Sequence, residues 1–423
     1  MSTVQIKGDE TPPADSLAGR LGGALHDMMR SSWLVVVCAV ILAILAGSIL
    51  IAVTDPQVIE TSQYFFARPG DTFAAIWSAV SGAYVAFFNG AFYNLNRPEF
   101  ATGIKPITET LTFATPLIMA GLGIGLSFRA GLFNIGGRGQ MLFGAAFGGW
   151  VAFAIPMPPG VHAAVAILVG MLAGAFFAAI AGVLKAYTGA HEVIVTIMLN
   201  YVAGALIVYM LTTQGLLQAP GQQNPKSPPT METAILPRLF GDQYRLHLGF
   251  ILAIIATIAV WWVLERSSLG FKLRAVGLNP SAAKTAGINV KTIIVVAMAM
   301  SGALVGLAGV NQVTGTETSG FSSGVDAGIG FDAITVALLG KSTPWGIFVA
   351  GILFGAFKAG GYTMQGAEGI QIDIVAVVQS LIVLFIAAPP LVRSIFRLPS
   401  PGSKRRQKKA KGDIDSTTEA VSA

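Results

Sequence analysis

Long uncharged apolar runs recur along the whole chain, and this pattern restricts the possible fold more than any other feature. The hydrocarbon core of a bilayer is about 30 Å thick, so a helix needs about 20 mostly apolar residues to cross it. Backbone groups in lipid must bond to one another, which makes such runs helical. Ten runs of this kind lie at residues 33–53, 107–127, 141–155, 162–184, 193–211, 247–263, 292–313, 331–340, 345–360 and 371–388. They predict an all-α, polytopic membrane helix bundle with about ten transmembrane helices.

The composition supports a membrane protein and excludes most other classes. Of the 423 residues, 53% are apolar and 11% are charged, whereas a soluble domain has about 25% charged residues. The net charge of +6 does not indicate a nucleic-acid partner, because the basic residues lie in short loops and a tail rather than on one folded face. We therefore expect the chain to be surrounded by a lipid bilayer and to bind no nucleic acid.

The positions of lysine and arginine predict the orientation, because cytoplasmic loops are enriched in both. With the N-terminus in the cytoplasm, 20 of the 27 basic residues fall on the cytoplasmic side, six fall outside, and Lys358 lies within a run. Both termini are then cytoplasmic and the number of spans is even. The predicted organisation is a cytoplasmic arm at 1–32, a transmembrane domain at 33–390 with external segments at 54–105 and 212–246 and a cytoplasmic loop at 264–291, and a basic, disordered cytoplasmic tail at 391–423.

One segment leaves the span count open. Residues 73–92 carry no charge and are nearly long enough to cross a bilayer. Their Gly, Ser and Asn content makes them less apolar than the other runs, which favours a helix that lies on the outer membrane interface. The alternative is an eleventh span, which would place one of the two basic ends outside.

The sequence contains no recognisable catalytic, metal or nucleotide site. The segment TVALLGKS (335–342) resembles a phosphate-binding loop, but Thr335 stands where that loop needs glycine. The four histidines lie far apart without the spacing of metal ligands. We therefore expect no enzymatic activity and no cofactor in this chain.

The cytoplasmic loop contains a short helix signal. Asn279 suits a helix N-cap, Pro280 suits the first helical position, and Gly287 suits the residue after the end. Ala282 and Ala283 lie between them, where small side chains permit close approach to another surface. A helix of two turns is not stable alone in water. The segment is therefore either a docking element for a partner or an ordinary ordered loop.

Polar residues at the membrane face and inside the runs are the remaining candidates. The turn FRAGLFNIGGRGQ (128–140) places Asn134, Gly136, Gly139 and Gln140 in a sharply folded backbone, which we expect at the cytoplasmic face. Asn200, Asn311, Gln312 and Lys358 are costly in lipid and are candidates for lining a substrate pathway. Hydrogen bonding between helices explains each of these polar residues equally well. Pairs of glycines in GxxxG spacing indicate close helix packing and give no information about substrate.

Five segments together resemble the bacterial ABC importer permeases of the branched-chain amino acid, ribose and nucleoside group. They are GLGIGLSFRAGLFNIGGRGQ (121–140), IVTIMLNYVAG (194–204), LGFKLRAVGLNPSAAKTAGI (269–288), SGALVGLAG (301–309) and GIGFDAITVALLGKSTPWG (328–346). The turn, the MLNY segment and the GFDAITVALLG segment resemble the nucleoside branch, which is linked to basic membrane lipoproteins. The long N-terminal part resembles the larger of that branch's two permeases. Arg138 departs from the pattern, because the turn in this family usually has an acidic residue there, and a charge-swapped partner would compensate.

The resemblance implies a function for the chain. It would be the inner-membrane permease subunit of a bacterial importer for nucleosides, which an external substrate-binding lipoprotein delivers. A separate ABC ATPase subunit would bind and hydrolyse ATP, docking on the segment 279–287 as its coupling helix, and a second, shorter permease would complete the pathway. Two alternatives remain: the same machine carrying a ribose-type or other simple sugar, and an ion-coupled secondary transporter. The latter needs carboxylates within the membrane, whereas Asp332 and Asp373 lie at the ends of their runs.

Overall fold

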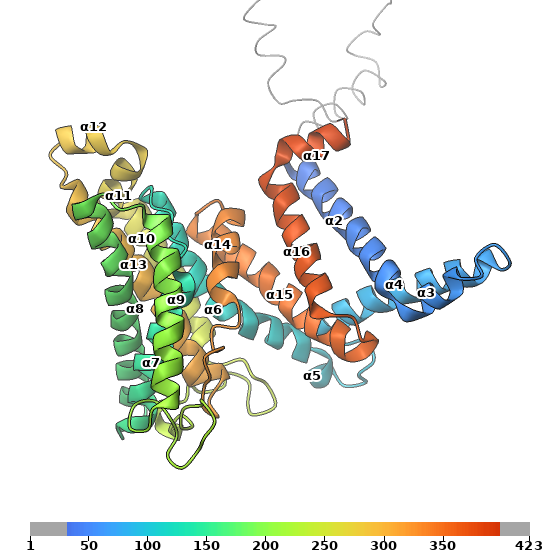
Figure 1. Cartoon of the computed structure of the whole chain (residues 1–423), viewed down its shortest axis with the longest axis horizontal. Coiled ribbons are helices and arrows are strands. Elements are labelled where there is room, and N and C mark those ends of the chain that lie inside the picture. The colour runs from blue at the N-terminus through green and yellow to red at the C-terminus, as the bar shows by residue number, and fades with distance from the viewer. Residues whose placement is uncertain (1–31, 398–423) are drawn as a thin grey trace, which may run out of the picture. The chain divides into compact units, whose positions relative to one another are not determined.

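The computed structural model describes residues 32–397, and nearly all the regular structure in this range is helical (Figure 1). The long helices are α2 (Ser32–Thr54), α4 (Pro69–Ala91), α6 (Lys105–Arg129), α7 (Gly137–Ala154), α8 (Val161–Thr188), α9 (Glu192–Thr212), α10 (Gly249–Arg266), α13 (Val290–Asn311), α15 (Pro344–Glu368) and α16 (Ile372–Ala387). The shorter ones are α3 (Pro56–Ser62), α5 (Phe100–Gly103), η1 (Glu232–Ala234), α11 (Ser268–Leu278), α12 (Pro280–Thr285), η2 (Gln312–Thr316), α14 (Ile329–Leu339) and α17 (Pro389–Ile395). Within residues 32–397, extended pairing is limited to two isolated bridges. The structure is therefore the predicted membrane helix bundle.

The chain divides into two compact units. One contains residues 50–376, and the other contains residues 1–49 and 377–423. The described part of the second unit consists of most of α2, most of α16, and α17. The predicted arm lies almost wholly outside the described residues, as does the tail beyond residue 397. The first residues of the predicted tail belong to α17, which ends at Ile395.

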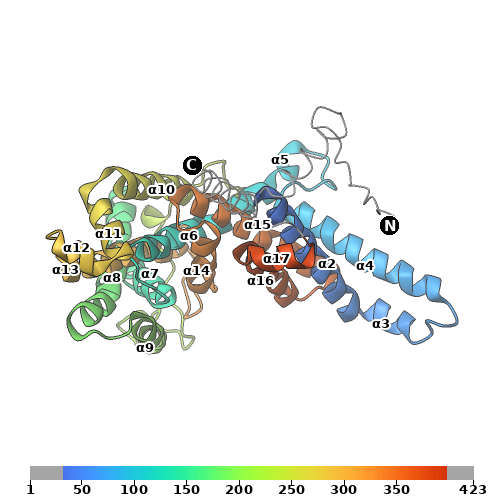
Figure 2. The same ribbon diagram turned by 90° about the horizontal axis from the view of Figure 1, so that it is seen from above.

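Glycine contacts hold the centre of the larger unit together. Helices α7, α8, α9 and α13 lie side by side, as Figures 1 and 2 show. A Cβ added to Gly144 of α7 would collide with the backbone of Gly306 of α13, and one added to Gly174 of α8 would collide with that of Gly302. The GxxxG pairs therefore bring helix backbones into direct contact, as their spacing predicts.

Helices α6 and α15 form a second close pair, and they run in opposite directions. Gly351 packs against Ile118, whereas Gly355, one turn later in α15, packs against Thr110, earlier in α6. The start of α6 and the end of α15 are therefore neighbours. Helix α4 packs against α15 near the same end, where Gly90 contacts Thr363.

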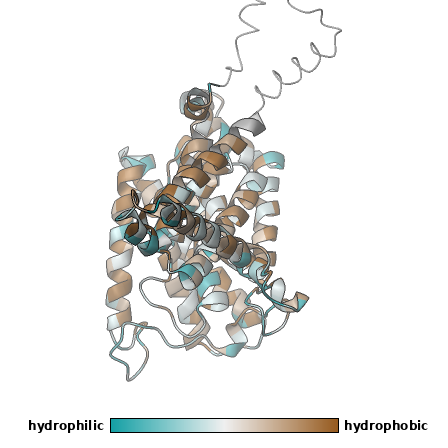
Figure 3. Cartoon of the chain, turned by 90° about the vertical axis from the view of Figure 1, so that its right-hand side faces the viewer, coloured by the Kyte–Doolittle hydropathy of each residue, from teal (hydrophilic) through white to brown (hydrophobic). Residues whose placement is uncertain are grey.

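Apolar side chains cover the outside of the larger unit. On α8, Leu168, Leu172 and Phe176 are more than half exposed and follow one another at four-residue spacing. Brown, hydrophobic turns dominate the upright helices in Figure 3, and teal residues are most frequent in loops and at helix ends. An exposed apolar stripe of this length is typical of a surface that faces lipid or another membrane chain.

Seven helical segments within residues 32–397 are long and apolar enough to cross a membrane, or eight if the bent pair Val40–Thr54 and Pro56–Ser62 counts as one span. All ten predicted runs are helical, but α7, α14 and α16 are not among these seven, and α2 counts only as part of the bent pair. Helix α4, which we predicted to lie at the outer interface, does meet the requirement, with the lowest mean hydropathy of the seven (1.2). In Figure 1, α4 runs across the page whereas α8 and α9 run upright. The protein is thus a multi-pass membrane protein.

Candidate functional site

The turn between α6 and α7 lies inside the bundle. Asn134 is fully buried, and its amide nitrogen donates to Ser301 Oγ (2.9 Å) and to Gln140 Oε1 (3.1 Å). Its amide oxygen accepts hydrogen bonds from the backbone of Gly136 (2.9 Å) and from Gln140 Nε2 (3.0 Å). Asn134 and Gln140 therefore bond mainly to each other and to the turn that contains them.

Asn200 of α9 completes the support of this turn. Its amide oxygen accepts from the backbone N–H of Gly139 (2.8 Å), and its amide nitrogen donates to the carbonyl of Ile135 (2.9 Å). Gly139 lies so close to Asn200 and Phe177 that a side chain there would collide with them. The structure therefore uses Asn200 for hydrogen bonding between elements, the alternative to a role in lining the pathway.

Two helices, α7 and α14, begin near this turn, inside the bundle. Ser301 is 11 residues from the start of α13, which is about 16 Å at 1.5 Å per residue. Helix α7 starts beside it at Gly137, and the backbone of Gly137 touches that of Gly330 in the first turn of α14. Discontinuous helices that begin within the membrane are typical of transporter binding and gating regions. The turn that we predicted for the membrane face thus reaches the middle of the bundle.

Two ion pairs flank the meeting point of α7 and α14. Arg138 Nε lies 3.5 Å from Asp326 Oδ1, and the Asp326 side chain is only 7% exposed. Lys358 Nζ lies 2.8 Å from Asp332 Oδ2 and donates to the carbonyl of Ala327 (3.1 Å). Asp326 is thus an acidic partner for Arg138, as a charge swap requires. Asp332 is at a helix end, as its position in the run predicts, but it lies beside the middle of α15 because α14 is only half a span long.

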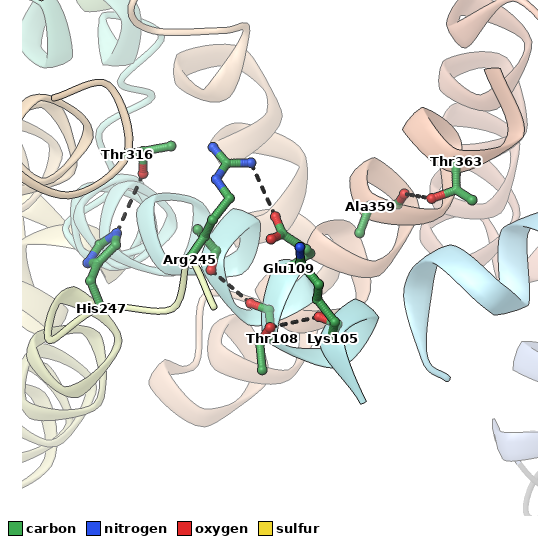
Figure 4. Close-up of polar contacts among 9 residues, drawn as sticks. Lys105, Thr108, Glu109, Arg245, His247, Thr316, Ala359 and Thr363 are labelled. Carbon is green, nitrogen blue, oxygen red and sulfur yellow. Dashed lines mark hydrogen bonds and ion pairs between the residues drawn. The ribbon is translucent and has the colours of Figure 1, made fainter. Parts of the chain in front are cut away.

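A cavity of about 540 Å³ opens where the start of α6 meets the ends of α4, α13 and α15. Its lining residues come from five stretches of the chain: Asn89, Gly90, Asn94, Arg97, Thr102, Lys105, Pro106, Glu109, Phe113, Arg245, Glu317, Ala359, Tyr362 and Thr363. Figure 4 shows Arg245 and Glu109 pointing toward each other above the first turn of α6, with Thr363 on the neighbouring helix. The volume is in the range of cavities that bind small molecules.

The cavity combines charged groups with aromatic rings. Arg245 Nη1 pairs with Glu109 Oε2 at 3.2 Å. The rings of Phe113 and Tyr362 stack with their centroids 5.4 Å apart. Arg97, Lys105 and Glu317 also line the cavity, and none of the three forms an ion pair with another described residue. The cavity therefore offers a flat apolar surface together with unpaired charges of both signs.

His247 is buried two residues after the cavity residue Arg245, and it is neutral at physiological pH. Its burial lowers its pKa to about 4, with the nearby positive charges of Arg245 and Arg238 acting in the same direction. The backbone N–H of Gly249 donates to Nδ1 (3.1 Å), which places the proton on Nε2, 3.5 Å from Thr316 Oγ1. The ring thus connects the start of α10 to the end of α13.

Asn311 and Gln312, both predicted to line the pathway, are buried at the end of α13 and do not line the cavity. Neither amide atom of Asn311 has a hydrogen-bond partner within residues 32–397. Gln312 begins the π-helical turn η2, and its carbonyl accepts from the backbone N–H of Glu317. This turn carries the chain from α13 to the cavity.

The predicted short helix exists at the opposite end of α13. Asn279 Oδ1 caps α12 by accepting from the backbone N–H of Ala282 (3.0 Å), and Pro280 is its first residue. Gly287 follows the helix with φ +81°, a conformation that favours glycine. Ala282 is exposed, but Ala283 is only 4% exposed because its own chain covers it. Of the two alanines, only Ala282 is therefore free to contact a partner.

Sequence reasoning missed functional candidates at both ends of α13. Leu278 and Phe271 of α11 are 88% and 61% exposed beside α12, outside any candidate span. Their apolar character in a charged loop is a signal of a docking surface. The cavity residues carry a weaker signal, since Glu109, Arg245 and Glu317 are simply charges near the ends of apolar runs and come together only in the fold.

Comparison with known proteins gives consistent matches. Residues 107–387 match the family described as branched-chain amino acid transport system, permease component. No solved structure matches the chain significantly.

Three curated relatives are similar over most of their length. The guanosine ABC transporter permease protein NupP of Bacillus subtilis is 36% identical over 75% of this chain and 88% of its own. The glucose ABC transporter permease protein TsgB13 of Haloferax volcanii is 34% identical over 70% of this chain and 79% of its own. The nucleoside ABC transporter permease protein NupB of Lactococcus lactis is 35% identical over 71% of this chain and 83% of its own.

Proposed function

Because this chain belongs to the family of branched-chain amino acid transport system permease components, we propose that it forms the pathway of an ATP-driven importer for nucleosides. One observation carries the mechanism. A single helical segment, Val290–Thr316, has the exposed helix α12 just before its start and the cavity residue Glu317 just after its end. A partner that moves α12 thereby acts on the cavity.

We propose that the cavity end faces outward and that the α12 end faces the cytoplasm, with both termini cytoplasmic and ten spans. The excess of lysine and arginine in the loops at the α12 end supports this orientation. Helix α4 then lies at the outer interface, which agrees with its low mean hydropathy and its transverse direction. The 18-residue helix α7 and the 11-residue helix α14 account for two of the ten segments.

The partners follow from this orientation. An ABC ATPase subunit docks on α12, with Leu278 and Phe271 in the contact. An external substrate-binding lipoprotein releases its ligand at the cavity, and a second, shorter permease covers part of the apolar outer surface. ATP is bound by the ATPase subunit, and this chain carries no cofactor. The complex resides in a bacterial inner membrane.

The proposed cargo rests on the relatives and on the cavity. Two of the three relatives are named as permeases for guanosine or nucleosides, and one for glucose. A stacked aromatic pair beside polar groups suits a nucleoside better than a simple sugar, which has no aromatic face. Ion-coupled transport is disfavoured, because Asp332 is neutralised by Lys358 and is not free to bind a coupling ion.

The residues of the chain suggest how the pathway opens and closes. Segment 326–332 is held to α7 by the Arg138–Asp326 pair and to α15 by the Lys358–Asp332 pair. When the ATPase draws α12 inward, α13 moves relative to these contacts, with close backbone approaches to α7 and α8 at Gly302, Gly306 and Gly309. Substrate passes from the cavity toward the two ion pairs as they rearrange.

The test is transport by the reconstituted complex. Proteoliposomes with both permeases, the ATPase and the lipoprotein should accumulate tritiated guanosine only with ATP inside the compartment that holds the ATPase, and an ionophore should have no effect. Excess unlabelled uridine should compete, whereas ribose and glucose should not. ATP-dependent accumulation of glucose without guanosine would assign the sugar alternative, and uptake that requires an ion gradient would reject an ATP-driven importer.

A further inference from the structure

The cavity is lined by two stacked aromatic rings. Phe113 of α6 and Tyr362 of α15 stack with an interplanar angle of 28°. Phe113 is half-buried, whereas Tyr362 is 50% exposed. Phe113 thus packs against one face of the Tyr362 ring, and the half-exposed tyrosine lines the cavity.

We propose that the face of Tyr362 opposite Phe113 binds the base of the incoming nucleoside by stacking and that Glu317 accepts hydrogen bonds from the same ligand. This inference rests on the proposed function, since it names where the nucleoside is held. Stacking on an aromatic side chain tolerates any base, because every base has a π-face. The site would therefore accept purine and pyrimidine nucleosides alike.

The charges of the cavity favour a polar ligand of low net charge. Glu109 and Arg245 neutralise each other at 3.2 Å. Glu317 has no ion-pair partner among the described residues. The cations Arg97 and Lys105 also have none there. A carboxylate accepts hydrogen bonds from ribose hydroxyls and base N–H groups, and the cations donate to base carbonyls and ring nitrogens.

The position of Tyr362 connects the cavity to the interior. Lys358 is four residues earlier in α15, so both side chains lie on one face of the helix, about one turn apart. Lys358 is in turn bonded to Asp332 and to the carbonyl of Ala327. A ligand that leaves Tyr362 along α15 therefore meets the Lys358–Asp332 pair next.

The experiment measures binding of tritiated guanosine to the purified complex of both permeases and the ATPase, without the lipoprotein. Tyr362→Ala should weaken guanosine binding about tenfold or more, and Tyr362→Phe should restore it. Tyr209→Ala is the matched control, because Tyr209 is 61% exposed on α9 and lies outside the cavity. Glu317→Ala should also weaken binding, whereas Glu99→Ala, an exposed carboxylate that does not line the cavity, should not.

The outcomes separate this inference from the proposed function. Basal ATP hydrolysis should be unchanged in Tyr209→Ala and Glu99→Ala, and restored binding in Tyr362→Phe excludes misfolding as the cause of the loss in Tyr362→Ala. If Tyr362→Ala binds guanosine as tightly as Tyr209→Ala does, the stacking site is wrong even though the complex imports nucleosides. If the unmodified complex binds and imports ribose but no nucleoside, the proposed cargo is wrong instead.

Discussion

Arg138 shows how one residue change is compensated in this fold. The sequence pattern places an acid at this position, and the arginine instead pairs with Asp326 at 3.5 Å. Asp326 is nearly buried, and a buried carboxylate without a partner is far more costly than a buried pair. The partner is 188 positions away in sequence, so only the folded structure identifies it.

Arg138→Glu should destabilise the protein by about 1–3 kcal/mol, because it places two carboxylates together. The effect is smaller than for a fully buried pair, since the Arg138 side chain is 39% exposed. The double variant Arg138→Glu with Asp326→Arg should recover much of the loss in thermal unfolding of the detergent-solubilised protein. Arg68→Glu, which breaks the exposed Arg68–Asp71 pair, should have almost no effect. A double variant no more stable than Arg138→Glu would contradict direct pairing.

His247 makes the stability depend on pH. Its pKa of about 4 in the folded protein is below the ordinary value of 6.5, so the folded state favours the neutral ring. This contribution is complete above pH 6.5 and is lost as the pH falls from 6.5 to about 4. We expect the thermal unfolding temperature to fall over this window, and to fall less in His247→Gln. The exposed His191 supplies the control, and an equal pH dependence in His247→Gln and His191→Gln would refute the assignment.

At the scale of elements, α12 is a helix that the rest of the chain supports on one side only. It has six residues, of which Ala283 alone is buried. Its cap, its first-turn proline and its terminal glycine were all evident in the sequence, because each is a local signal. Which alanine faces outward was not evident, because that depends on how α12 packs on its neighbours.

Ala282→Arg should abolish docking without disturbing the bundle, since Ala282 is exposed and lies outside every candidate span. We expect the ATPase no longer to co-purify and guanosine uptake to fall at least about tenfold, at unchanged membrane levels; a tenfold loss corresponds to about 1.4 kcal/mol of coupling. Leu278→Asp should act in the same way. His191→Arg adds the same charge at the exposed turn between α8 and α9, where no docking is proposed.

Normal uptake and normal ATPase co-purification in Ala282→Arg would show that α12 is an ordinary loop helix. Ala283→Arg is a poorer test, because its side chain is covered by its own chain and the change would unfold α12 itself. Gly287→Val shares this defect, since the left-handed backbone there costs about 1 kcal/mol or more for other residues.

At the scale of the whole molecule, the sequence predicts the helices well and their depth poorly. All ten apolar runs are helical, because the bilayer leaves the backbone no alternative. The half-length of α14 was visible only as a short apolar run. The position of the Asn134 turn inside the bundle depends on Ser301 and Asn200, which are remote in sequence. The cavity was not predictable for the same reason, since it combines five separate stretches of chain.

The proposed orientation is testable by cysteine labelling in a Cys38→Ser background, which removes the only native thiol. A cysteine at Ser281 should react with a membrane-impermeant maleimide only from the cytoplasm, and one at Asn224 only from outside. Cysteines at Asp71 and Asn96, on either side of α4, should both react from outside. Labelling of Ser281 from outside would invert the topology, and opposite labelling of Asp71 and Asn96 would make α4 a span.

The π-helical turn Gln312–Thr316 has a geometric consequence for the cavity. Its hydrogen bond from the N–H of Glu317 to the carbonyl of Gln312 spans five residues, so the turn holds one residue more than an α-helical turn. Each residue of an α-helix advances the side-chain direction by about 100°. Deleting one residue from this turn would restore regular winding and rotate everything after it by that angle, so that Glu317 would point away from the ligand. The direction of the Glu317 carboxylate therefore depends on the number of residues in this turn and not on which side chains they carry.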